Sequence, residues 1–336
     1  MKKIIKFLVS AVCAAVTAVS FSACAGGETS PEKVSLLGID AASVGVLPDV
    51  DYYVAAEPAA TARATAVGLK FSGDLQQLYG EEGGYPQAVI VAKNELVESN
   101  PAFLSAFLEE VEANEEWLKT ASAQTVIDSV ASHLPEGTTP TFNAKNLTSQ
   151  VIANCGIHLV YAANDKERVT NFLDEMAEVE PSMVGEVSES FFCTSLGTAS
   201  TSSTVSVYAP DGAPALALAK LMAEENTFSQ TALTYNIVAA DTIGARVSGE
   251  NPAADICILP VNAASKLLGS GQKYKMLGTV TNGNLYILSK DGEHLTAENL
   301  SVLKGKTVGV INLANVPGLT LKIVLNKYDI PYETVS

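Results

Sequence analysis

Short apolar runs alternate along the chain with longer segments of helical periodicity. In Thr204–Asn226, apolar and polar residues alternate up to Ala209-Pro210, and apolar residues then recur at helical spacing from Pro214 onward. Proline at the first helical position needs no amide partner and therefore favours a helix start. The pattern predicts a strand, a tight turn over Pro210–Ala213 and a helix.

The same strand-to-helix unit recurs, which predicts the α/β class with doubly wound sheets. The apolar run Ala88–Ala92 suits the middle of a parallel sheet, whereas glycines make Gly68–Tyr85 loop-rich. The predicted strands are Val34–Ile39, the run that ends at Glu57-Pro58, Ala88–Ala92, Val205–Pro210, Thr234–Ala239, Asp255–Leu259, Met276–Val280, Leu285–Leu288 and Thr307–Ile311. The predicted helices begin near Pro58, Pro101, Ala123, Asn146, Asp165, Pro214, Asn262 and Asn315.

Glycine, proline and uncharged polar residues follow most of these strands. Ligands bind beyond the carboxyl ends of parallel strands, where free amides of helix starts can meet a polar group. The sequence therefore predicts a ligand site without covalent chemistry, lined by Asp211, Gly212, Ala213, Pro214, Asn262, Asn282, Asn284, Asn315, Pro317, Gly318 and Glu57.

Two of these positions have an alternative interpretation. The turn at Asp211 is also compatible with an ordinary strand-to-helix turn that Asp211 caps. Glu57 could bond a ligand amine or hydroxyl, or could be a solvated charge at a helix start.

Composition narrows the function classes. The chain has 336 residues, of which 47% are hydrophobic, enough for two α/β domains. Its net charge of −16, with no basic cluster beyond the first six residues, argues against a nucleic-acid partner. His133 and His158 have no acidic or cysteine partner at ligand spacing, and no nucleophile motif or dinucleotide motif is present. We therefore expect no catalytic residue, no metal and no cofactor.

Residues 1–23 resemble a signal peptide, with a basic start and an apolar stretch too short for a comfortable membrane span. Ser22-Ala23-Cys24 resembles a bacterial lipobox, although Phe21 stands where leucine is usual. Cys24 would then carry a lipid that anchors the protein outside the cytoplasmic membrane, with residues 24–33 as a tether. The alternative is an ordinary signal peptide with an incidental cysteine. A disulfide between Cys155 and Cys193 is possible in an exported protein, but the sequence gives no argument for it.

Five segments together resemble the solute-binding lipoproteins of ABC importers, in the branch related to thiamine-pyrimidine, nitrate, taurine and sulfonate binding proteins. This resemblance implies a type II periplasmic-binding architecture with two α/β domains, a hinge and a cleft for one small solute. It also implies a monomer whose partners are an ABC permease and its ATPase. The segments are Tyr53–Thr61, Pro86–Leu118, Val205–Met222, Ala254–Leu268 and Gly305–Val324.

The segment order departs from that family, because the segments that would come last there come first here. A circular permutation would explain the order, and folds tolerate one when the old termini lie at the surface. One domain would then comprise residues 34–84 and 291–336, and the other residues 85–193 and 204–290. Residues 194–203 would be a Ser/Thr linker, and crossings near Tyr85 and Lys290 would form the hinge. Misaligned weak repeats or a shuffled reading frame would give the same appearance.

Two other functions stay open. An enzyme on the same fold, resembling a pyrimidine synthase of thiamine biosynthesis, would need a histidine or cysteine near the cleft. A surface sensor or adhesion lipoprotein would work without a transporter. No arginine or lysine lies in the predicted turns, which favours a neutral or cationic heterocycle over a sulfonate or nitrate, although helix N-termini alone can hold an anion.

Overall fold

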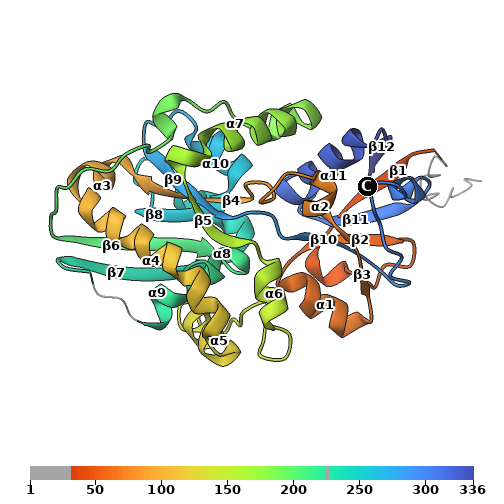
Figure 1. Cartoon of the computed structure of the whole chain (residues 1–336), viewed down its shortest axis with the longest axis horizontal. Helices are drawn as coiled ribbons and strands as arrows, with labels where there is room; N and C mark the ends of the chain where they lie inside the picture. The colour runs from red at the N-terminus through yellow and green to blue at the C-terminus, as the bar shows by residue number, and fades with distance from the viewer. Residues whose placement is uncertain (1–31, 225–227) are drawn as a thin grey trace, which may run out of the picture.

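The computed structural model describes residues 32–224 and 228–336, so Cys24 and nearly all of the predicted tether lie outside the described part. Two mixed six-stranded sheets and their covering helices form an α/β structure, with sheet A on the right of Figure 1 and sheet B on the left. Within the described residues, no helix has both the length and the apolar character needed to span a membrane.

Sheet A has the strand order β12-β1-β11-β2-β10-β3. Strands β12, β1, β11 and β2 run parallel, and β10 runs antiparallel to both β2 and β3. Its elements are β1 (Val34–Ile39), η1 (Ala41–Ser43), β2 (Tyr52–Ala56), α1 (Ala59–Val67), β3 (Lys70–Asp74), α2 (Leu75–Tyr79), β10 (Leu285–Ser289), η5 (Leu300–Leu303), β11 (Thr307–Ile311), α11 (Val316–Lys327) and β12 (Tyr332–Val335).

Sheet B has the strand order β5-β9-β4-β8-β6-β7. Strands β7, β6 and β8 run parallel, and β4 runs antiparallel to both β8 and β9. Its strands are β4 (Ala88–Lys93), β5 (Ile157–Tyr161), β6 (Ser203–Pro210), β7 (Thr231–Val238), β8 (Ile256–Pro260) and β9 (Tyr274–Thr281). Its helices are α3 (Asn94–Ser99), α4 (Pro101–Thr120), α5 (Ala123–Ala131), α6 (Ser149–Asn154), α7 (Ala162–Val179), η2 (Pro181–Met183), η3 (Glu189–Phe191), α8 (Ala213–Leu216), α9 (Ala219–Ala223), η4 (Ala240–Arg246) and α10 (Val261–Leu268).

The two sheets share one arrangement. Read as β1-β11-β2-β10-β3 and β7-β6-β8-β4-β9, each has three parallel strands, then one antiparallel strand, then a fifth strand parallel to the first three. In each sheet the antiparallel strand is reached directly from the other sheet. Residues 84–87, the first crossing, lead from the sheet A elements into β4. Residues 282–284, the second crossing, lead from β9 into β10.

The core is continuous across the two halves. One cluster of buried side chains includes Leu36 and Leu285 of sheet A together with Cys257 and Met276 of sheet B. At the crossing, the rings of Tyr85, of Tyr79 on α2 and of Phe172 on α7 form a triad with centroids 5.2 to 5.6 Å apart. Burying three aromatic rings in mutual contact fixes the first crossing against helices of both halves.

Several predicted elements are confirmed within a few residues, and the predicted parallel direction holds for β1, β11 and β2 and for β6, β7 and β8, but not for β4 and β10. The run Ala88–Ala92 is a central strand, as expected, yet β4 pairs antiparallel with both neighbours instead of lying in a parallel sheet. A continuous apolar run reports burial on both faces and carries no information about direction.

Other boundaries also differ. The loop-rich region Gly68–Tyr85 contains β3 and α2, whose capping residue Asp74 accepts a hydrogen bond from Gln77. Strand Leu285–Ser289, assigned from sequence to the same domain as β6, pairs with β2 and β3 of sheet A. Strands β5 and β12 were not predicted. Cys155 and Cys193 are both free thiols.

Candidate functional site

The carboxyl ends of β6 and β8 lie side by side in sheet B. Val207 pairs with Ile256 in parallel register, so Asp211 and Asn262 follow the ends of adjacent strands. The Asp211 carboxylate accepts hydrogen bonds from the backbone amides of Gly212 and Thr141, both at 2.8 Å. Burial raises the pKa of this carboxyl group. Asp211 thus binds the 141 loop as well as its own turn, and α8 has no side-chain cap.

Gly212 allows the turn that starts α8. Its φ of 107° and ψ of −148° are accessible to glycine alone. The helix predicted from Pro214 onward is interrupted, because α8 ends at Leu216 and α9 begins at Ala219. Ala213 is buried and Pro214 is partly exposed, so this turn presents backbone and small side chains at the rim.

Asn262 lies inside α10 and does not cap it, because the helix begins at Val261 after Pro260. The side chain is 2% exposed, and its amide nitrogen donates to Met183 O and to Asn315 Oδ1, both at 3.3 Å. Its Oδ1 is buried without a partner. This oxygen accepts no hydrogen bond from the described residues, so it is open to a donor from a water molecule or a solute.

We call the edge of a sheet at the carboxyl ends of its parallel strands its rim. The rim of sheet A carries Asn315, Pro317 and Gly318 at the start of α11. Asn315 is exposed and its side chain contacts Asn262 of the other half. A Cβ on Gly318 would lie 1.8 Å from Leu313 O, so the close approach of this turn requires glycine. The structure therefore brings one predicted residue of each half into direct contact.

Glu57 directly follows strand β2, which neighbours β11 because Val310 of β11 pairs with Val54. Its side chain is 1% exposed, which excludes the solvated alternative. The carboxylate accepts from Thr61 N at 2.9 Å and from Thr61 Oγ1 at 2.6 Å, and the Asn154 side chain of α6 also bonds to it. Burial raises the pKa of Glu57 despite these bonds.

Asn284 and Gln87 join the two crossings. The Gln87 side-chain amide donates to Asn284 Oδ1, and Asn284 N donates to Gln87 Oε1 at 3.1 Å. Asn284 also donates to Glu57 O at 2.9 Å, and Gln87 N donates to Thr281 O at 2.9 Å. Asn284 is thus a structural link between the crossings, 2% exposed.

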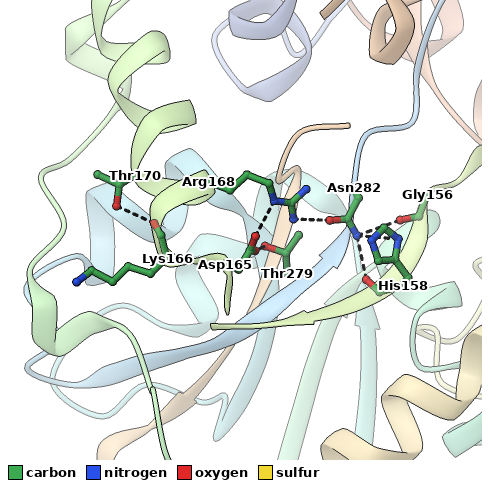
Figure 2. A network of polar contacts seen from close by, with 8 residues as sticks. All are labelled: Gly156, His158, Asp165, Lys166, Arg168, Thr170, Thr279 and Asn282. Carbon is green, nitrogen blue, oxygen red and sulfur yellow. Dashed lines mark hydrogen bonds and ion pairs between the residues drawn. The ribbon is translucent and has the colours of Figure 1, made fainter. Parts of the chain in front are cut away.

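Asn282 belongs to a polar network that reaches from β5 to α7 (Figure 2). Its Oδ1 accepts from Arg168 Nη2 at 2.6 Å, and its amide nitrogen donates to His158 O at 2.9 Å and contacts His158 Nδ1 at 3.2 Å. Arg168 Nε pairs with the buried carboxylate of Asp165 at 2.6 Å, and Thr279 donates to the same carboxylate. The network ties the second crossing to sheet B.

The predicted residues thus form two groups. Asn262 and Asn315 meet between the rims, whereas Asn282 and Asn284 hold the crossings. No contact between Asp211 and another predicted residue outside its own turn is among the described hydrogen bonds. Five surface hollows of about 260 to 530 Å³ lie elsewhere, and none of the five is lined by a predicted residue.

These groups offer hydrogen-bonding and charged side chains, and the cysteine and histidine beside them are buried or partly buried. Cys155 lies near Glu57, but its thiol is buried, donates to Val151 O and has a raised pKa because of burial. Burial lowers the pKa of His158, which keeps the ring neutral toward Asn282. Within the described residues, no group of three or more histidine, cysteine or acidic side chains is placed to hold a metal ion.

Several partners were missed at the sequence level. Thr61 follows Glu57 by four residues on a helix start, a spacing that could have been noticed. Thr141, Gln87 and Arg168 reach the site from distant segments, which no local pattern reports.

Comparisons of the chain with protein-family models, curated proteins and solved structures find no match.

Proposed function

We propose that this protein is an extracytoplasmic, lipid-anchored solute-binding protein that captures a small solute and delivers it to an ABC importer. The observation that carries the proposal is the meeting of two equivalent rims. Two sheets of the same strand order direct the ends of β8 and β11 toward each other, and Asn262 contacts Asn315 at that place. Ligands of α/β sheets bind at such strand ends.

The crossings support a hinge between two domains. Along residues 32–224 and 228–336, the backbone passes from the elements of one sheet to those of the other at residues 84–87 and 282–284, and these two segments hydrogen-bond to each other. Short paired segments of this kind can absorb the rotation of two bodies around a ligand. We therefore propose the second domain boundary near Asn284 in place of Lys290, because residues 282–284 lead from β9 into β10.

The proposed circular permutation is consistent with the sheet A pairing. Strand β1 runs parallel to β11 and lies between it and β12, the strand that follows α11, so the first and last described strands are neighbours. β12 pairs with the other side of β1. The proposal keeps Cys24 as the lipid anchor.

A second candidate, an enzyme on this fold, would use the neighbouring Cys155 and His158. The burial of the Cys155 thiol and its raised pKa make it a poor nucleophile, because the thiolate is the reactive form. Binding without turnover is therefore the better-supported function.

A thermal-shift screen of the purified protein, followed by mass spectrometry of the eluted compound, tests the proposal. The panel contains pyrimidines, thiamine precursors, polyamines, taurine, alkyl sulfonates and nitrate. A solute at 100 times its Kd should add about 2.7 kcal/mol of stability and should be recovered unchanged. Recovery of a chemically altered compound would contradict a function of binding alone.

Permease and ATPase genes beside the gene for this protein would separate an importer component from a surface sensor.

A further inference from the structure

We propose that the hollow between α4, α6 and β5 binds a small uncharged ring compound, which accepts a hydrogen bond from Nε2–H of His158. We call it the α6 hollow. Its volume is about 260 Å³, and none of the residues predicted from sequence to bind the solute lines it. A protein cavity of about 150 Å³ can hold benzene, so this hollow has room for one substituted ring. The proposal does not depend on the solute-binding function.

Aliphatic side chains from three elements line the α6 hollow. They are Leu118 of α4, Ile152 of α6 and Ile157 of β5. Leu118 and Ile157 are buried, whereas Ile152 keeps part of its surface exposed, which a bound ring would cover. Pockets for small ligands combine such an apolar wall with a few polar groups that fix the orientation of the ligand.

The charged residues that line the α6 hollow pair with each other. Lys119 Nζ lies 3.3 Å from Glu115 Oε1, and both residues belong to α4. A charged ligand would therefore lose hydrating water without gaining an unpaired charged partner. This arrangement favours an uncharged compound over an anion or a cation.

The hydrogen-bond network determines which nitrogen of His158 carries the proton (Figure 2). Arg168 can only donate, so the Asn282 atom that it contacts at 2.6 Å is the side-chain oxygen. The Asn282 amide nitrogen then lies 2.9 Å from His158 O and 3.2 Å from His158 Nδ1. Since an amide nitrogen can only donate, Nδ1 is an acceptor without a proton. Burial lowers the pKa of His158 and so favours the neutral ring, whose one proton is then on Nε2.

Nε2–H is a donor that the fold leaves available. Within residues 32–224 and 228–336, the side-chain hydrogen bond of His158 involves Nδ1 alone. Nε2 is not among the buried atoms that lack a partner, so it remains accessible. Because the Nδ1 edge of the ring meets Asn282, the accessible Nε2 is left to border the α6 hollow, which His158 lines. A carbonyl oxygen or an unprotonated ring nitrogen of a ligand would accept a hydrogen bond from it.

The tautomer can be measured without a ligand. A long-range ¹H–¹⁵N NMR spectrum at pH 7.5, with His158→Phe to assign the signals, should show His158 with its proton on Nε2. A proton on Nδ1 would overturn the proposal.

Three compounds with the same ring and different head groups test the ligand class: benzamide, benzoate and benzylamine. Their binding is followed by NMR through the backbone amide signals of Ile157 and His158. We expect saturable shifts with benzamide at millimolar concentration and at least tenfold weaker binding of the two charged compounds. Equal or tighter binding of benzoate or benzylamine, or no saturable shift with any of the three, would overturn the proposal.

Two variants locate the bound compound. Ala153 is exposed on α6 and lines the hollow, so the ring of Ala153→Phe should fill it and weaken benzamide binding at least tenfold. Ala113→Phe, at an exposed position of α4 that does not line the hollow, is the matched control and should leave binding unchanged. His158→Phe keeps a ring but removes Nε2–H and should weaken binding to the same extent. Unchanged binding of benzamide in Ala153→Phe, or in folded His158→Phe, would overturn the proposal.

Discussion

At the scale of single residues, the candidate site depends on a few positions whose neighbours leave little freedom. Gly212 adopts a conformation that other residues avoid, and Gly318 lies against Leu313 O. Asn262 and Glu57 are buried just after strand ends, and each makes a side-chain contact with the other half. These constraints are backbone and burial effects, and they can be measured without a ligand.

Gly212→Ala should destabilise the protein by about 1–3 kcal/mol, because a side chain at this φ and ψ is strained. No atom would clash with the new Cβ, so the loss reports backbone strain alone. Urea unfolding measures it. Gly38→Ala is the control, since its Cβ would make only ordinary contacts at 3.7 Å; an equal loss in both variants would contradict the strain argument.

His158 should make stability depend on pH. Its folded pKa lies below the ordinary value of 6.5, so the unfolded chain binds its proton more readily. The contribution is complete above pH 6.5 and is lost as pH falls through the folded pKa. The unfolding free energy of the wild type, relative to His158→Gln, should therefore fall between pH 7.5 and pH 5. A constant difference over that range would show that Asn282 does not require the neutral ring.

At the scale of elements, the polar network around α7 should be worth more than the ion pairs on its surface. Arg168→Ala leaves the buried Asp165 carboxylate without its cation and removes the bond to Asn282. We expect a loss of about 2 kcal/mol in urea unfolding. Lys166→Ala on the same helix, whose side chain points away from Asn282 in Figure 2 and pairs with exposed Glu189, should cost less than about 1 kcal/mol. Equal losses would contradict the structural role of the network.

Most elements could be predicted from sequence because their signals are local. Val34–Ile39 and Thr307–Ile311 match β1 and β11, and the apolar stripe after Asn100 gives α4. Strand β3 was hidden by the glycines of its region, and β5 lies between two predicted helices. The direction of β4 and the sheet of β10 depend on long-range pairing. Local periodicity cannot encode either property.

The site was predictable to the same extent. The turns at strand ends follow from local pattern, and two of them, at Asn262 and Asn315, do meet. The roles of Asn282 and Asn284 could not be foreseen, since Arg168 and Gln87 come from other segments. Whether the remaining residues bind a solute stays a prediction.

At the scale of the whole molecule, two sheets of equivalent order exchange one strand each and share a core. Each crossing leads directly into a strand, β4 or β10, that is hydrogen-bonded to two neighbours in the sheet it joins. Side-chain contacts of Asn262 with Asn315 and of Asn154 with Glu57 join the two halves. On the proposed function these contacts belong to a closed arrangement, which a solute that bridges the rims would stabilise over an open one.

Asn262→Ala should therefore weaken solute binding while leaving the fold intact. It removes one contact between the halves and an unpartnered buried acceptor, two effects of opposite sign on stability. The Tm of the solute-free protein should change little, and the solute-induced rise should shrink. Ser265→Ala on the same helix, whose hydroxyl bonds within its own half, is the control. A full solute-induced rise in Asn262→Ala would remove Asn262 from the site.

The most direct test of the account is the distance between the two halves with and without the stabilising solute. Spin labels at Thr65 on α1 and at Lys145 before α6, both exposed, allow double electron–electron resonance in a Cys193→Ser background. Closure around a solute predicts a broad or double distance distribution for the free protein and a single shorter distance once the solute is bound. An identical distribution in both states would contradict a solute-binding protein that closes at its crossings.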